Sequence, residues 1–132
     1  MTIQAAVKDF VSRRTFAIAG VSRSGEKYGN LVFRDLKAKG YKLYPIHPEA
    51  STLEGVAVYK DFDSLPEKVD GVILVVPPAQ TEKMIREAAA AGGKRVWMQP
   101  GAESEAAIQF CEENGILEVY NMCIMVHSGG PG

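Results

Sequence analysis

Features that mark whole classes of protein are missing from this sequence. Its 132 residues include only two cysteines, Cys111 and Cys123, at a spacing that fits neither a CxxC motif nor a zinc finger. No apolar run approaches the length of a membrane span, and the N-terminal residues do not have the pattern of a signal peptide. The net charge of -1 argues against a polyanionic partner. We therefore expect a cytoplasmic protein with no nucleic-acid and no membrane partner.

The common catalytic motifs are missing as well. The sequence contains no GxSxG nucleophile elbow, no HExxH metal motif, no GxxxxGK[ST] phosphate loop and no GxGxxG dinucleotide fingerprint. Cys111 falls at core-facing spacing, and His127 lies in a small, polar C-terminal tail. The residues alone therefore predict no catalytic group and no metal site, and give no basis for an enzymatic activity of the chain on its own.

What the sequence does contain is an alternation of amphipathic stretches and short apolar runs. Apolar residues recur at helical spacing in four stretches: residues 3–11, 29–39, 80–91 and 103–114. Five short runs are typical of buried strands: residues 15–20, 41–46, 69–76, 94–98 and 116–120. Residues 47–66 are irregular, with a short extended piece at 56–59. Strands that alternate with helices imply a parallel sheet covered on both faces.

We therefore predict a single α/β domain over residues 1–132, with a flexible tail from about residue 127. The predicted fold is a Rossmann-like three-layer domain with a five-stranded parallel sheet in the order 3-2-1-4-5. A ligand in such a fold binds outside the carboxyl ends of the strands where the order reverses, here between strands 1 and 4. A homodimer or a protein partner would be one way to cover the open sheet edges.

The loop after the first predicted strand has the composition of a phosphate-binding loop. Gly20 permits a tight turn, and a helix that begins near Gly29 would aim free N–H groups at an anion. Hydroxyl and cationic side chains for phosphate lie between them: Ser22, Arg23, Ser24 and Lys27. The alternative is a solvated connection between strand and helix.

Three further loops follow strands at the same edge. Pro45-Ile-His-Pro48 has no carboxylate at the position where an NAD site would bind the ribose hydroxyl. His47 either tolerates an extra phosphate on the ribose or only forms hydrogen bonds with the backbone. In Val75-Val-Pro-Pro-Ala-Gln80, the prolines either flank an adenine or aliphatic arm or simply end the strand. In Trp97-Met-Gln-Pro-Gly101, Gln99 is expected at the crevice mouth and Trp97 in the core.

Together these stretches resemble the small CoA-binding proteins, whose fold is similar to the CoA-binding domain in the alpha subunit of succinyl-CoA synthetase. The matching segments run in order from about residue 15 to residue 125: Ala17–Ser22, Lys27–Gly29, Gly40-Tyr41, Tyr44–Pro48, Gly55, Val69–Val72, Val76–Pro78, Lys94–Ala102 and Cys123-Ile124. The run Val96-Trp-Met-Gln-Pro-Gly101 is the most specific of them.

The resemblance implies binding of coenzyme A or an acyl-CoA at the carboxyl ends of the strands, by a stand-alone carrier, sensor or partner module. The residues implied are Gly20, Val21, Ser22, Arg23 and Ser24 around the diphosphate, Lys27 near its charge, Tyr28 beside them, Ile46, His47 and Pro48 by the adenosine and its 3′-phosphate, Val76, Pro77 and Pro78 by the adenine or pantetheine, and Gln99.

Two departures from the family pattern narrow the functions that the resemblance implies. Many members read Val-Asn-Pro where this chain has Ile46-His-Pro48, which leaves the role of His47 open. The phosphorylated histidine and the ATP-binding part of the synthetase lie in other domains, so acyl-CoA synthesis is not implied. The alternatives are an NAD(P)-binding oxidoreductase-like domain and an interaction module without a ligand.

Overall fold

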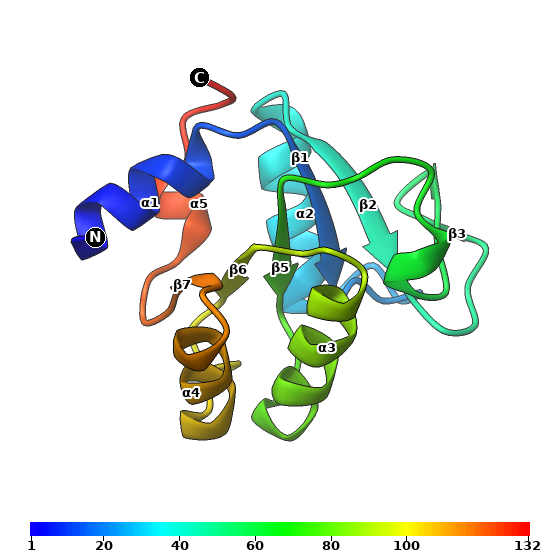
Figure 1. The fold of residues 1–132 in the computed structure, drawn as a ribbon. Helices are drawn as coiled ribbons and strands as arrows, with labels where there is room; N and C mark the ends of the chain where they lie inside the picture. The colour runs from blue at the N-terminus through cyan, green and yellow to red at the C-terminus, as the bar shows by residue number, and fades with distance from the viewer.

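The computed structural model describes residues 1–132 and is built around a sheet in which every neighbouring pair of strands is parallel (Figure 1). Its five strands are β1 (Thr15–Ala19), β2 (Lys42–Ile46), β5 (Gly71–Leu74), β6 (Arg95–Met98) and β7 (Leu117–Val119). They lie side by side in the order β2-β1-β5-β6-β7. All residues of β1 and β5 are buried, as expected for strands covered on both faces.

The predicted strand order 3-2-1-4-5 is wrong. Counted within this sheet, the observed order is 2-1-3-4-5, and the reversal lies between β1 and β5. In the predicted order, the third strand would lie outside β2, at the edge of the sheet. The chain instead forms a small hairpin, β3 (Thr52–Leu53) with β4 (Val56–Ala57), and a 3₁₀-helix, η1 (Phe62–Ser64), before it enters β5. Outside β2 there is only one isolated parallel bridge, between Ile46 and Tyr59.

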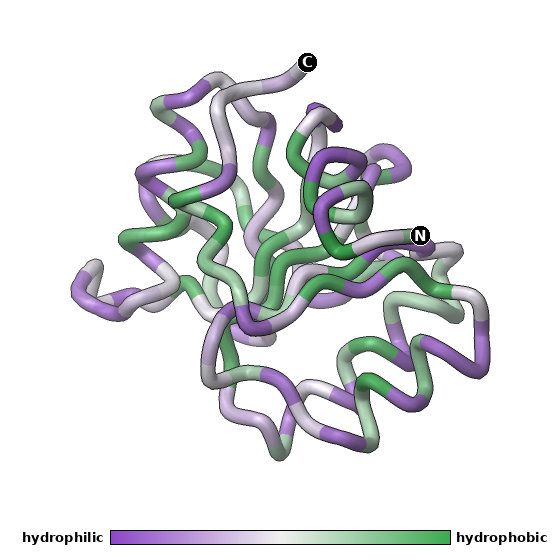
Figure 2. The backbone as a smooth tube through the Cα atoms, turned by 90° about the vertical axis from the view of Figure 1, so that its left-hand side faces the viewer, coloured by the Kyte–Doolittle hydropathy of each residue, from purple (hydrophilic) through white to green (hydrophobic).

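Helices cover both faces of the sheet (Figure 1). On one face lie α1 (Ile3–Val11), α2 (Tyr28–Ala38) and α5 (Ile124–His127), and on the other α3 (Pro78–Ala90) and α4 (Glu105–Glu113). Each face has its own hydrophobic cluster, and hydrophobic residues follow the central strands in Figure 2. The predicted three-layer α/β architecture is thereby confirmed.

Trp97 is at the centre of the larger cluster. Its side chain is fully buried, and its ring packs edge-on against Phe10 at a centroid distance of 5.3 Å. The indole N–H donates to the carbonyl of Met122 at 2.9 Å, which satisfies its only polar group. The expectation that Trp97 belongs to the core is confirmed.

Local signals in the sequence fix where the helices begin. The hydroxyl of Thr2 accepts from the N–H of Ala5 at 3.1 Å, and that of Ser104 accepts from the N–H of Ala107 at 3.1 Å. Pro78 begins α3, a position that needs no N–H donor. None of the helices combines the length and the hydrophobicity that crossing a bilayer requires.

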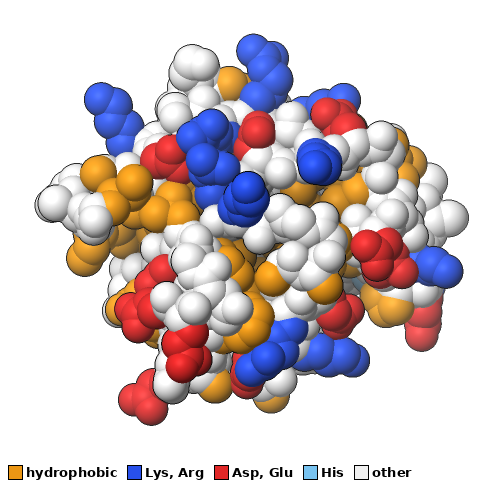
Figure 3. All heavy atoms as spheres, in the orientation of Figure 1, with side chains coloured by type: hydrophobic (Ala, Val, Ile, Leu, Met, Phe, Trp, Pro, Cys, Tyr) orange, Lys and Arg blue, Asp and Glu red, His pale blue; other side chains and the backbone are white.

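The C-terminal residues run back along the molecule toward the start of the chain. The ammonium of Lys39 donates to the Ser128 hydroxyl at 3.0 Å, and the N–H of Gly132 donates to the carbonyl of Ser12 at 2.9 Å. The flexibility expected from about residue 127 concerns motion and stays a prediction. On the face seen in Figure 3, positive and negative side chains are interspersed, and hydrophobic ones gather at the exposed start of α1.

Candidate functional site

A cavity of about 430 Å³ opens at the carboxyl ends of β1, β2 and β5. Most of the predicted site residues line it: Gly20, Val21, Ser22, Lys27, Tyr28, Ile46, His47, Pro48, Val76 and Pro77. Four do not: Arg23, Ser24, Pro78 and Gln99. This is the edge where an open α/β sheet places its ligand, although the reversal that creates it lies between β1 and β5.

Five further residues line this cavity that the sequence analysis did not include among the ligand-contacting residues: Ala19, Gly29, Val75, Gln80 and Met84. Three of them directly adjoin predicted site residues in the sequence. Gln80 and Met84 are different, because they lie four residues apart on α3 and so share one helix face. That helical spacing is the signal that could have found them.

Two glycines bring the start of α2 close to the ends of the strands. A Cβ at Gly20 would lie 2.1 Å from the carbonyl oxygen of Val75, and the φ of Gly20 is +113°. A Cβ at Gly29 would lie 2.1 Å from the carbonyl oxygen of Gly20. No other residue fits either position without a backbone shift, so this contact between β1, β5 and α2 depends on glycine.

The turn of residues 22–25 is held from within the protein. The buried amide of Asn30 accepts from the N–H of Ser22 at 3.0 Å and from its hydroxyl at 2.8 Å, and donates to its carbonyl at 2.9 Å. The hydroxyls of Ser22 and Ser24 are 2.9 Å apart. Asn30 therefore fixes the position of Ser22 at the edge of the cavity.

Backbone donors remain available around this turn. The N–H groups of Arg23, Ser24, Tyr28 and Gly29 donate no hydrogen bond to another group of the chain. The last two belong to the first turn of α2, where the helix dipole also favours an anion. Donors of this kind are what a phosphate group needs.

The cations of the loop differ in their availability. Lys27 lines the cavity, is exposed, and forms no ion pair. The guanidinium of Arg23 lies 3.8 Å from the carboxylate of Glu49, and its side chain is 60% exposed and does not line the cavity. Lys27 is therefore the cation best placed for an anion inside the cavity.

His47 has a backbone role, one of the two alternatives that the sequence left open. Its Nδ1 atom accepts from the N–H groups of Glu49 and Ala50, both at 3.1 Å. In the neutral ring, the proton is then on Nε2. The ring therefore braces the turn after β2 with one nitrogen and keeps a donor on the other.

A buried amide connects this edge of the sheet with α5. Gln99 is fully buried, its Oε1 accepts from the N–H of Ile124 at 2.7 Å, and its Nε2 donates to the hydroxyl of Tyr28 at 3.2 Å. It therefore lies behind Tyr28, inside the protein rather than at the crevice mouth. The same Nε2 lies 3.5 Å from the Sγ of Cys123.

Cys123 belongs to this group, although the sequence analysis gave it no role in the site. Burial raises the pKa of its thiol, but hydrogen bonds from Tyr28, Gln99 and two backbone N–H groups outweigh burial and lower that pKa below its ordinary value. The bond with Cys123, at 3.2 Å, raises the pKa of Tyr28 to about 12. Tyr28 therefore stays protonated, and its hydroxyl can donate to the sulfur when the thiol is ionised.

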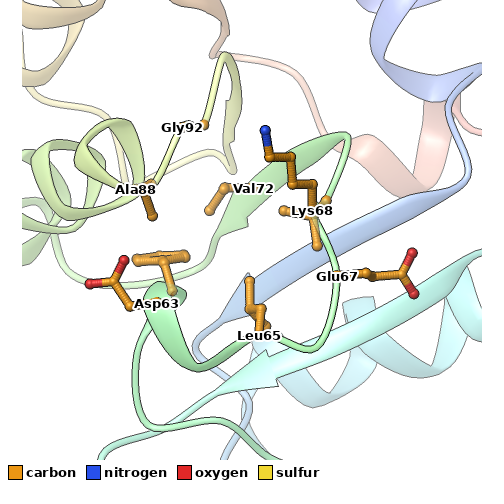
Figure 4. Close-up of a pocket in the computed structure, with 11 residues that line it drawn as sticks. Asp63, Leu65, Glu67, Lys68, Val72, Ala88 and Gly92 are labelled. Carbon is orange, nitrogen blue, oxygen red and sulfur yellow. The ribbon is translucent and has the colours of Figure 1, made fainter.

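A second cavity, of about 350 Å³, lies between the end of α3 and the segment that leads into β5 (Figure 4). Figure 4 shows the side chain of Glu67 turned toward β2, where it accepts from Lys42 at 2.6 Å and from the hydroxyl of Tyr44. The carboxyl end of α3 presents carbonyl groups, which disfavour an anion. This cavity is therefore a poor phosphate site.

Comparisons with known proteins identify the family of the chain. The model of a family described as "CoA binding domain" matches residues 14–129. The alpha subunit of acetate–CoA ligase [ADP-forming] II from Pyrococcus furiosus is 34% identical over 88 residues, which cover 66% of this chain and 19% of that protein. The chain therefore spans about a fifth of the length of this relative.

Solved structures resemble the chain over most of its length. A conserved hypothetical protein from Pyrococcus furiosus is 39% identical with a TM-score of 0.83, and the match covers 87% of this chain and 99% of that one. A hypothetical protein from Pyrococcus horikoshii OT3 is 28% identical with a TM-score of 0.88, over 96% and 89% of the two chains. The resemblance to CoA-binding proteins is thereby confirmed, and with it coenzyme A as the cofactor. The chain belongs to the CoA binding domain family.

Proposed function

We propose that this chain binds coenzyme A or an acyl-CoA in the cavity at the carboxyl ends of β1, β2 and β5. In this proposal the diphosphate lies on the loop Gly20–Ser24 and the first turn of α2, with Lys27 as its counter-charge. The adenosine lies beside Ile46, His47 and Pro48, and the pantetheine arm runs past Val76 and Pro77. The observation that carries the proposal is the meeting of free N–H donors, an unpaired lysine and apolar walls in one cavity.

The chemistry of the cavity fits the parts of this ligand. Diphosphate is held best by backbone N–H groups and a nearby cation, which the loop and α2 supply. Adenine and the pantetheine arm need apolar surface, which the prolines and Val76 provide without competing donors. His47 keeps Nε2–H as a donor near the ribose, where a 3′-phosphate would accept it.

We propose binding as the task of the chain by itself, as a carrier, a sensor or the module of a larger assembly. The matched residues make up only 19% of the acetate–CoA ligase subunit to which the chain is similar, so that protein's reaction would require parts beyond this domain. No group of this chain has to react with the ligand for the proposed function.

Calorimetric titration of ligand-stripped protein with CoA, dephospho-CoA and NAD tests the proposal. We expect CoA to bind about tenfold more tightly than dephospho-CoA, because one charge-assisted hydrogen bond to the 3′-phosphate is lost. NAD should give no signal at the same concentrations. Equal affinities for CoA and dephospho-CoA would remove the 3′-phosphate contact from the proposal.

The variant Ser22→Asp tests the position of the diphosphate. A carboxylate at this place repels phosphate, so CoA binding should be lost, and the melting temperature without ligand should fall by a few degrees because the bond from the hydroxyl to Asn30 is lost as well. Unchanged CoA binding would show that the loop assignment is wrong. For the wild-type protein, binding of NAD instead of CoA would favour the oxidoreductase-like alternative, and the absence of any binding would favour an interaction module.

A further inference from the structure

The hairpin between β3 and β4 turns through two residues, Glu54 and Gly55, that both have positive φ, at 51° and 78°. Tight hairpin turns of this kind strongly favour Asn or Asp followed by Gly. Glutamate is an unfavourable residue here, because its Cβ crowds the backbone in the left-handed region. A residue that breaks the local preference points to a contact made elsewhere.

That contact is made with α2. The side chain of Glu54 is only 16% exposed, and its Oε2 accepts from the side-chain amide of Asn30 at 2.7 Å. Its Oε1 lies 3.4 Å from the Nε of Arg34, one helical turn further along α2. The strained turn therefore directs a carboxylate against two side chains on the same face of the helix.

Each of these two side chains binds one end of the turn of residues 22–25. Asn30 makes three hydrogen bonds to Ser22, through its N–H, its hydroxyl and its carbonyl. Arg34 donates to the carbonyl of Gly25 through Nη2. Glu54 contacts both Asn30 and Arg34. It therefore connects the hairpin, through these two side chains, to residues 22–25.

We propose that Glu54 is a positioning residue for the turn of residues 22–25, and that the β3–β4 hairpin thereby contributes to CoA binding. The inference rests on the proposed function. Glu54 does not line the cavity and acts through Asn30 and Arg34. It orients the Asn30 amide so that Ser22 keeps its place at the edge of the cavity.

Three variants of Glu54 separate this role from a structural one. Glu54→Ala removes both contacts, and Glu54→Gln keeps an oxygen that can accept from Asn30. Glu54→Asn suits the turn better but is one methylene shorter. We expect CoA affinity to fall about tenfold for the Ala and Asn variants and to stay within about twofold for Gln. Glu67→Ala is the matched control, because Glu67 also accepts two side-chain hydrogen bonds but lies far from the loop.

Amide hydrogen exchange of the ligand-free variants gives a readout that does not depend on CoA. In Glu54→Ala and Glu54→Asn, we expect faster exchange at Ser22, whose N–H is bound by Asn30, with the sheet strands unchanged. For Glu67→Ala, exchange at Ser22 and CoA affinity should equal those of the wild type. In the Asn variant, loss of affinity without loss of melting temperature would identify positioning.

The outcomes are distinct. Unchanged exchange at Ser22 in the Ala variant would overturn the inference, as would faster exchange throughout the protein together with a lowered melting temperature in all three variants. If the wild-type protein binds no CoA, the proposed function is overturned but the inference about Glu54 is not. The exchange data, which need no ligand, would then test whether Glu54 positions Ser22.

Discussion

The two ends of the sheet both carry a hollow, and the two hollows differ more in chemistry than in size. At the carboxyl end, a cavity of about 430 Å³ is bordered by the start of α2, with free N–H groups and Lys27. At the amino end, a cavity of about 350 Å³ is bordered by the end of α3 and by side chains such as Glu67 that already have partners (Figure 4). Volume alone therefore does not identify a binding site in this fold.

The direction of the chain explains the difference. In a parallel sheet with right-handed crossovers, a helix begins shortly after the carboxyl end of one strand and ends before the amino end of the next. Helix N-termini with unsatisfied donors therefore gather at one end, and helix C-termini with unsatisfied acceptors at the other. The anion site follows from the topology, and Gly20 and Gly29 allow the start of α2 to come close to the ends of β1 and β5.

We expect the largest difference between substitutions of two glycines that lie at opposite ends of the sheet. Gly29→Ala places a Cβ against the carbonyl of Gly20, so we expect a loss of about 3 kcal/mol in unfolding free energy and the loss of CoA binding. Gly92→Ala has open space around it and only a positive φ to strain, so about 1 kcal/mol should be lost. Urea unfolding and calorimetry would measure both. Equal destabilisation of the two variants would contradict this account of the close approach.

The two cysteines offer the next contrast. Burial raises the pKa of Cys111 to about 12, whereas hydrogen bonds lower that of Cys123. Because the thiolate is the nucleophile, iodoacetamide at pH 8 should alkylate Cys123 more than about a hundredfold faster than Cys111. Peptide mapping by mass spectrometry would give both rates. Removing the Tyr28 donor with Tyr28→Phe should slow the reaction at Cys123, and an unchanged rate would assign no role to that bond.

Two lysines test which end attracts the phosphate. Lys27→Ala should weaken CoA binding about tenfold and make it less sensitive to salt, because a charge-assisted contact is lost. Lys68→Ala, at the amino-end cavity, should leave CoA affinity unchanged. Titrations at two salt concentrations would decide, and a larger effect of Lys68→Ala would move the site to the other end of the sheet.

The smallest expected effect is the pH dependence of stability that Glu67 causes at the amino end of the sheet. Hydrogen bonds from Lys42 and Tyr44 lower the pKa of Glu67, so its contribution to stability is present above its ordinary pKa and is lost as the pH falls through the lowered value. The melting temperature of Glu67→Gln should therefore lie slightly below that of the wild type at pH 7, and the gap should narrow as the pH falls below the ordinary glutamate pKa and through the lowered one. A gap that persists in acid would show that the carboxylate charge is not its cause.

Much of the fold can be predicted from the sequence because its signals are local. The apolar runs and the glycines after the helices placed every strand and helix of the main architecture within a few residues. The strand order was missed because it depends on how residues 47–70 cross the sheet, and their hairpin strands have only two residues each. Four-residue α5 is likewise too short for a periodic pattern.

The residues of the candidate site also fall into those that the sequence could predict and those that it could not. Loops that directly follow strands could be predicted, because the ends of parallel strands meet at one edge. Cys123 could not, since its partners Tyr28 and Gln99 lie 95 and 24 residues away in the sequence. The positions of Arg23 and Gln99 also depend on tertiary contacts, which turn one side chain outward to Glu49 and bury the other behind Tyr28.

The burial of Trp97 has an experimental consequence. It is the only tryptophan in the chain, it has no contact with solvent, and it does not line the candidate cavity. Its fluorescence should therefore shift to longer wavelength only when the two core layers around the sheet separate. The protein carries an optical probe of its own unfolding that a ligand at the carboxyl ends of the strands leaves undisturbed.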